Sequence, residues 1–208
     1  MEGFAFNQRK KKPQQEEKKL TWQQRLIVDL QDLIYVLAGF MIVYMLVFRV
    51  VVVKGPSMYD TLVDGDRLVL VSNTLYNNPK QGDVIVASKQ SFKDGECIIK
   101  RVIATEGQTV DIDFQQGIVY VDGVGLKEDY THTMTNLAEG VRFPQVVPEG
   151  CVFAMGDNRN ESMDSRSPQI GFVDEREILG KAVFLMMPGT HNGTEPAQYN
   201  RIGFGVFR

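Results

Sequence analysis

Histidine and cysteine are scarce in this chain of 208 residues, which holds two of each. Cys97 and Cys151 lie far from each other and from His132 and His191, and no spacing typical of a zinc site occurs. The sequence therefore predicts no metal and no cofactor. Each cysteine falls in an apolar, strand-like run, so we expect both to be small buried hydrophobes, with a disulfide between them as the alternative. We expect the two histidines to lie in surface loops.

Basic residues are in deficit over the larger part of the chain. Residues 50–208 hold 15 Lys and Arg against 21 Asp and Glu, whereas residues 1–25 hold seven basic residues against three acidic ones. A domain with excess negative charge and no basic stripe repels a phosphate backbone. The charge distribution therefore argues against nucleic acid as a partner.

Long hydrophobic runs are also few, and a single one stands out, from Leu26 to Phe48. Its last part, Leu33–Phe48, carries no charge. At ~1.5 Å per helical residue the run is about 35 Å long, enough to cross a hydrocarbon core of ~30 Å. A buried core helix and a cleaved signal sequence are the alternatives, but no small-x-small cleavage site follows the run. We therefore expect a retained transmembrane anchor over residues 26–49.

The basic residues precede this span, which sets the expected orientation in the membrane. By the positive-inside rule, residues 1–25 form a basic tail in the cytoplasm. Residues 50–208 then form the extracytoplasmic, working part of a single-pass protein of the cell membrane. The lipid bilayer is accordingly the first expected partner.

No second long amphipathic helix follows the anchor; short runs rich in Val and Ile recur instead. Turn pairs such as Asp64-Gly65 and Asp122-Gly123 separate these runs. This pattern predicts a mainly β fold, a folded antiparallel sheet or barrel rather than an α/β design. The stretch of about 114–148 is interpreted as a small β insertion in this domain. The expected strands are residues 50–53, 67–71, 83–87, 97–104, 109–112, 118–121, 151–155 and 181–186.

A serine hydroxyl is a poor nucleophile without a neighbouring base, and no histidine sits in a suitable motif. Lys100 is the candidate base for Ser57. In the strand expected at residues 97–104, Lys100 and Arg101 point to opposite faces. If the Lys100 face is buried, desolvation lowers its pKa from ~10.4 toward about 7, and a neutral amine could deprotonate Ser57. The periodicity equally allows Arg101 to be the buried residue, with Lys100 at the strand edge.

A polar segment, MGDNRNESMDSR at residues 155–166, combines turn formers, charges and hydroxyls. Asp164 and Arg166 could pair if the segment is extended, and Ser162 adds a hydroxyl beside them. The segment is either part of a functional site or a polar surface loop with a salt bridge of little energetic value.

Taken in order, these motifs resemble the bacterial type I signal peptidases, peptidase family S26. The members of that family are membrane-anchored Ser/Lys endoproteases that remove signal peptides from exported proteins. The resemblance covers nearly the whole chain. It rests on the N-terminal anchor, GPSMYDTL with GDRLVLV, GDVIVA, KRVIATEGQTV with the YVDG hairpin, GDNRNESMDSR and the closing GKAVF.

The resemblance implies roles for individual residues. Ser57 would be the nucleophile, with its backbone N–H as one oxyanion-hole donor, and Lys100 would be the general base. Ser162 would orient the lysine amine, while Asp164 and Arg166 would hold the loop that carries it.

Other positions either support the site or depart from the family pattern. Arg101 would be structural beside the base. Gly55 stands where some members have a serine hydroxyl as second oxyanion donor, so a backbone group or a water must replace that hydroxyl. Asp60 replaces a common proline, and Ala104 replaces a common glycine; neither change removes an essential group.

The substrate that the resemblance implies is the signal peptide of an exported preprotein, cut after small residues in an Ala-x-Ala pattern. It would lie extended between residues 51–55 and residues 97–100, adding a strand. The expected substrate-binding residues are Val53, Lys54, Pro56, Met58, Ile98 and Ile99.

Two other functions remain open on the sequence. A self-cleaving Ser/Lys repressor would need a DNA-reading helical domain where residues 1–49 offer a hydrophobic span. A non-enzymatic, membrane-anchored β adaptor would leave Ser57 and Lys100 without a role.

Overall fold

A computed structural model describes residues 21–92, 95–190 and 197–207 of the chain. It contains two compact units that divide between Ile42 and Val43. His191 and most of the expected basic tail lie outside the described residues.

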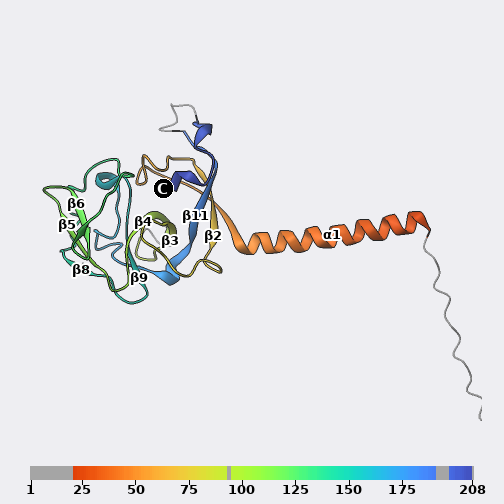
Figure 1. The fold of residues 1–208 in the computed structure, drawn as a ribbon, viewed down its shortest axis with the longest axis horizontal. Helices are drawn as coiled ribbons and strands as arrows, with labels where there is room; N and C mark the ends of the chain where they lie inside the picture. Colours follow the sequence, from red (N-terminus) through yellow and green to blue (C-terminus); the bar gives the residue numbers. More distant parts are fainter. Residues whose placement is uncertain (1–20, 93–94, 191–196, 208) are drawn as a thin grey trace, which may run out of the picture. The chain divides into compact units, whose positions relative to one another are not determined.

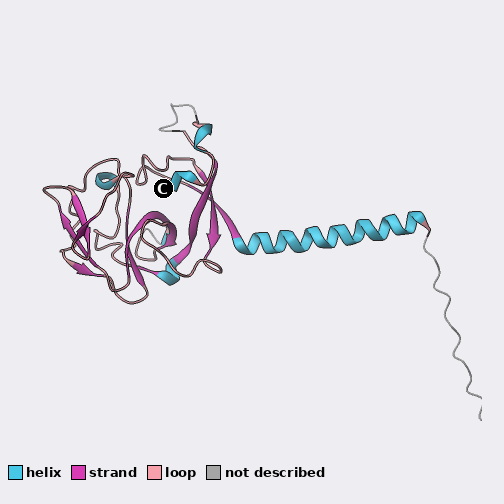
Figure 2. Ribbon diagram, in the orientation of Figure 1, coloured by secondary structure: helices cyan, strands magenta, loops and turns pink. Residues whose placement is uncertain are grey.

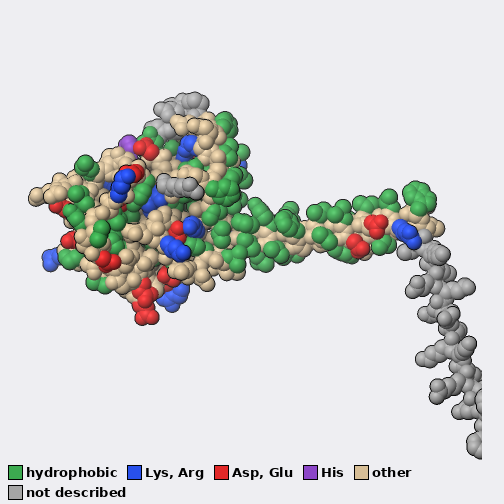
Figure 3. Space-filling model, in the orientation of Figure 1, with side chains coloured by type: hydrophobic (Ala, Val, Ile, Leu, Met, Phe, Trp, Pro, Cys, Tyr) green, Lys and Arg blue, Asp and Glu red, His purple; other side chains and the backbone are tan. Residues whose placement is uncertain are grey.

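The first element is helix α1, Trp22–Val47, which is long and apolar enough to cross a membrane. Its most apolar window has a mean hydropathy of 2.0 and buries none of its residues against the protein. Apolar side chains cover its surface (Figure 3). The helix begins four residues before the expected anchor because Thr21 and Gln24 form a capping box, each side chain bonded to the other residue's backbone N–H.

Seven antiparallel strands form the main sheet, in the order β1-β2-β11-β3-β4-β9-β10 (Figures 1 and 2). Strand β11, the last long strand of the described residues, lies inside the sheet, between β2 and β3. The strands are β1 Phe48–Val52, β2 Arg67–Ser72, β3 Val84–Ser88, β4 Cys97–Thr105, β9 Cys151–Met155, β10 Val173–Asp174 and β11 Ile178–Met187.

A second, four-stranded sheet has the order β7-β6-β5-β8. Its strands are β5 Thr109–Asp113, β6 Ile118–Val121, β7 Val124–Gly125 and β8 Gln145–Val146. The predicted mainly β fold, with one N-terminal apolar helix, is therefore confirmed. Strands β7, β8 and β10 escaped the sequence analysis because two residues are too few to show an alternating pattern.

The other elements of the described residues are short 3₁₀ helices. They are η2 Arg159–Glu161, η3 Glu175–Glu177, η5 Tyr199–Arg201 and η6 Gly205–Phe207.

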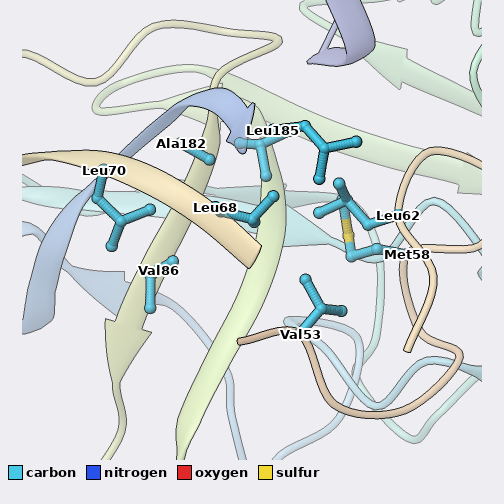
Figure 4. Packing of buried hydrophobic residues seen from close by; sticks show 9 residues of the cluster. Val53, Met58, Leu62, Leu68, Leu70, Val86, Ala182 and Leu185 are labelled. Carbon is cyan, nitrogen blue, oxygen red and sulfur yellow. The ribbon is translucent and has the colours of Figure 1, made fainter. Parts of the chain in front are cut away.

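One cluster of the hydrophobic core packs around the segment that follows β1 (Figure 4). Met58 and Leu62 are buried in it, beside Leu68 and Leu70 of β2 and Leu185 of β11. Burial of a Leu or Met side chain stabilises the fold by about 1.5–3 kcal/mol. The apolar residues of SMYDTL therefore hold Ser57 against the sheet.

The expectation that both cysteines are buried is wrong. Cys97 is exposed and Cys151 is half-buried, and both thiols are free, so the alternative of a disulfide is wrong as well. Cys97 is the first residue of β4 and pairs with Ser88, the last residue of β3, so it lies at the open end of the sheet. His132 lies in a loop, with its side chain 41% exposed, as expected.

Candidate active site

Ser57 lies in a tight loop after β1. Gly55 bends the chain with a φ of 83°, a value that favours glycine, and its N–H donates to Asp64 Oδ1 at 2.8 Å. The Ser57 carbonyl accepts the Asn158 N–H at 3.1 Å. The backbone around the Ser57 hydroxyl is thus fixed from both sides.

The Ser57 hydroxyl and the Lys100 amine are in direct contact. Lys100 Nζ donates to Ser57 Oγ at 2.9 Å and to the Ile99 carbonyl at 3.1 Å. Strand β4 brings Lys100 to this position from a point 43 residues further along the chain. Both acceptors are neutral, so neither hydrogen bond pairs the lysine with a carboxylate.

Lys100 and Arg101 are both buried, with exposed fractions of 5% and 1%. The sequence analysis treated burial of one residue as an alternative to burial of the other, and this was wrong. Strand β4 lies inside the sheet, between β3 and β9. Apolar clusters cover both of its faces, so alternation separates the two side chains without exposing either.

Burial lowers the pKa of Lys100 to about 8, against a usual value of 10.5. The negative charges of Asp164, Glu139 and Asp157 oppose this effect in part. Just above neutral pH, a sizeable fraction of the lysine is therefore an uncharged amine.

Arg101 has a different environment from its neighbour. Its guanidinium makes two hydrogen bonds to the Asp157 carboxylate, at 2.9 and 2.7 Å, and donates to the carbonyls of Gly82 and Phe207. Thr61, in the loop after Ser57, donates to the same carboxylate. Arg101 therefore braces the serine loop against β4.

Gly156 is packed between the two serines of the site. A Cβ at this position would overlap the Ser57 carbonyl oxygen and the Ser162 hydroxyl. Glycine at residue 156 is therefore what allows the loop of residues 155–166 to approach Ser57. The sequence analysis interpreted this glycine and Asp157 only as a turn and missed both roles.

The Ser162 hydroxyl donates to Asp164 Oδ2 at 2.9 Å. Arg166 makes two bonds of 2.8 Å to the Asp164 carboxylate and also donates to the Leu137 and Arg159 carbonyls. Asp164 and Arg166 are completely buried, so the alternative of a surface loop with an exposed salt bridge is wrong.

Glu139 is a further charged neighbour that the sequence analysis missed. Its side chain is 11% exposed, its Oε1 lies 3.0 Å from Arg166 Nη2, and its Oε2 accepts the Asp164 N–H at 3.3 Å. Burial and the nearby Asp164 raise the pKa of Glu139 to about 7. Its partners are 25 and 27 residues away in sequence, so no local pattern could have indicated them.

A cavity of about 520 Å³ opens beside Ser57 and Lys100. Strand β4 pairs with β9 only from Arg101 onward, which leaves residues 97–100 with an edge facing this cavity. All the expected substrate-binding residues line it: Val53, Lys54, Pro56, Met58, Ile98 and Ile99. The sequence analysis did not anticipate Val86, Phe92, Glu96 and Met163, which also line it.

A mainly β domain in which a buried amine contacts a serine hydroxyl at an apolar cleft is typical of serine hydrolases that use lysine as the base. Comparison with known proteins gives the family. Residues 27–187 match the family model described as signal peptidase, peptidase S26. The chain belongs to this family, so it is a hydrolase, and the resemblance drawn from the sequence is confirmed.

Two curated relatives, from Synechocystis and Bacillus, agree with this assignment. The chain is 40% identical over 151 residues to "Probable signal peptidase I-1" of Synechocystis sp., covering 68% of this chain and 72% of that one. It is 35% identical over 149 residues to "Signal peptidase I T" of Bacillus subtilis, covering 68% and 75%. A crystal structure of a signal peptidase I from Enterococcus faecalis V583 has 30% sequence identity and a TM-score of 0.40, over 50% of this chain and 96% of that one. With its N-terminal apolar helix, the protein is membrane-anchored.

Proposed function

We propose that this chain removes N-terminal signal peptides from exported preproteins as a membrane-bound serine endopeptidase. Ser57 is the nucleophile and Lys100 the general base. The observation that carries the proposal is the 2.9 Å contact between Lys100 Nζ and Ser57 Oγ in a buried site. A general base must lie within this distance of the proton that it removes.

In the first step, the neutral Lys100 amine takes the Ser57 proton while Ser57 Oγ attacks the carbonyl carbon of the scissile bond. The resulting ammonium gives its proton to the leaving amine of the mature chain, and an acyl-enzyme remains on Ser57. The neutral amine then activates a water, which releases the signal peptide and restores the serine. A pKa of about 8 makes the neutral amine accessible at ordinary pH.

The Ser57 backbone N–H is one proposed oxyanion-hole donor. Gly55 has no hydroxyl to offer as a second donor, and its own N–H already donates to Asp64. The second donor is therefore another backbone group or a water. Ser162 was expected to orient the lysine amine directly. Because its hydroxyl donates to Asp164 and it packs against Gly156, we propose that it acts on the site through these two residues.

The signal peptide is proposed to bind as an added strand along the edge of β4 at residues 97–100, opposite residues 51–55. Both segments line the same cavity. Val53, Pro56, Met58, Ile98 and Ile99 give its walls an apolar character, which suits small apolar side chains before the cut.

The proposed orientation puts the N-terminus in the cytoplasm and residues 50–208 on the outer side. Ser57 follows the last residue of α1 by ten residues, which keeps the nucleophile close to the bilayer, where signal peptides emerge. The expectations of no metal, no cofactor and no nucleic-acid partner remain predictions, and nothing in the site favours a repressor or an adaptor.

Cleavage of a purified precursor tests the proposal. The protein in detergent should cut an exported precursor once, after a small residue, and Ser57→Ala and Lys100→Ala should abolish the cut while thermal unfolding shows a folded protein. Lys127→Ala is the matched control, because the Lys127 side chain is 86% exposed and does not line the cavity. Full activity of Lys100→Ala would make the assignment of the base wrong.

A further inference from the structure

A second cavity, of about 660 Å³, lies on the other side of the catalytic loop. Residues 137–140 form one wall and residues 160–163 form the other, with Ser167 and Gln169 beside them. None of the steps proposed above uses this cavity.

The second cavity borders the first at one residue, Met163, which lines both cavities. Ser162 lines the second cavity and packs against Gly156, which in turn packs against the Ser57 carbonyl. Another cavity, near Lys181 and Phe207, shares no lining residue with either one. A chain that passes Ser57 from the first cavity therefore meets the second cavity next.

We propose that the second cavity binds the first residues of the mature chain, beyond the scissile bond, and that its carboxylates select against acidic residues there. This inference rests on the proposed function and extends it. The signal-peptide side of the substrate occupies the first cavity, between residues 51–55 and residues 97–100. The leaving side must then pass Met163.

The charge of the second cavity supports the selection. Glu139 and Glu161 line it, and no basic residue is among the described residues that do so. Arg166, which forms an ion pair with Glu139, is completely buried and is also bonded to Asp164 and to backbone carbonyls. Arg166 is therefore not free to neutralise an acidic side chain entering the cavity.

The polar groups of the cavity walls also support selection against acidic residues. Asn160 uses its amide nitrogen on Thr133 and the Met134 carbonyl, and its amide oxygen accepts the Leu137 N–H, so it is held by the protein. Glu139 Oε1 accepts no hydrogen bond from the described residues, although it lies 3.0 Å from Arg166 Nη2 in an ion pair. Basic or neutral side chains suit such walls better than acidic ones.

A matched series of substrates tests the proposal. All share the same signal peptide and Ala-x-Ala site and differ only at one of the first four mature residues, which is Asp, Asn or Lys. For wild type we expect kcat/KM at one or more of these positions to be about fivefold lower with Asp than with Asn, as for like charges in partial contact with water. Lys should equal or exceed Asn.

Two variants test the cavity itself. Glu161→Gln should bring the Asn-to-Asp ratio close to one, while Gln169→Glu, which adds a charge to the same wall, should increase it. Both positions are exposed, so the fold should be unaffected. Glu149→Gln is the matched control, because Glu149 is exposed and lines neither cavity.

The outcomes separate this inference from the proposed function. Equal kcat/KM for Asp and Asn at all four positions, or a ratio that Glu161→Gln and Gln169→Glu leave unchanged, would overturn the second cavity as the leaving-side site. Failure to cut any substrate of the series, including the Asn forms, would instead refute the peptidase function.

Discussion

Strand β4 carries two buried basic residues next to each other, Lys100 and Arg101. The two side chains have different partners on the two faces of the strand. On one face, Arg101 meets the Asp157 carboxylate in two hydrogen bonds, and its remaining donors reach carbonyls. On the other face, Lys100 contacts only a hydroxyl and a carbonyl through its hydrogen bonds. Burial with a counter-charge keeps a cation charged and makes it a brace. Burial without a carboxylate in direct contact favours the neutral form, which suits the proposed role of Lys100 as a base.

The largest effect should come from removing the base. Lys100→Met keeps the volume of the site but has no lone pair to accept the Ser57 proton, so kcat should fall on the order of 10³-fold. Cleavage of a precursor under single-turnover conditions measures this change. Lys127→Met should retain wild-type activity, and a loss of less than tenfold in Lys100→Met would show that Lys100 is not the base.

The second-largest effect should be on the stability of the fold, and it should come from the Arg101 face of β4. Arg101→Met leaves the completely buried Asp157 without its cation, which should destabilise the protein by about 3–5 kcal/mol. Urea unfolding measures the free energy of unfolding. In the double variant Arg101→Met/Asp157→Leu the unpaired charge is gone, so part of the stability should return. A destabilisation below ~1 kcal/mol in the single variant would contradict the role of a brace.

A smaller stability effect of opposite sign should accompany Lys100→Met. Because folding lowers the pKa of Lys100 from 10.5 to about 8, the unfolded chain binds more protons between these two pH values. The cost of burying the lysine is therefore full below about pH 8 and disappears as the pH rises toward 10.5. We expect the variant to be more stable than wild type by about 1–3 kcal/mol at pH 7, and this difference to vanish at high pH.

Denaturant unfolding of wild type and Lys100→Met at pH 7 and at pH 10 gives this difference directly. Equal stabilities at both pH values would mean that Lys100 is not penalised by burial. If Lys100→Met gains stability and loses activity, the two faces of β4 differ in kind, because Arg101→Met is expected to lose stability.

The sequence predicted the parts of the structure that leave a pattern in neighbouring residues. The long strands appear within a few residues of their expected positions because alternation and turn glycines are local signals, and Gly65 and Gly123 do have positive φ values. The face of Lys100 could not be decided, because alternation shows that neighbours point to opposite sides but not that both sides are covered. Asp157 escaped notice because its partner, Arg101, is 56 residues away.

The smallest effect should come from Glu139, whose negative charge acts on the proposed base, Lys100. Asp164, Asp157 and Arg166 are the other charges that act on Lys100, and the pKa of Glu139 is raised to about 7. Wild-type activity should fall toward acid pH with a midpoint near the lysine pKa of about 8. Glu139→Gln removes a negative charge that stabilises the ammonium form, so the midpoint should move to lower pH by roughly half a unit.

The pH dependence of kcat/KM between pH 5 and 10 measures this midpoint in both proteins. Glu149→Gln, which removes an equal charge at an exposed position, should leave it in place. A wild-type profile that is flat down to pH 5 would remove the lysine from the mechanism. A midpoint that moves to higher pH in Glu139→Gln would instead mean that Glu139 acts on Lys100 by holding Asp164 and Arg166 in position, since loss of its charge alone can only favour the neutral amine.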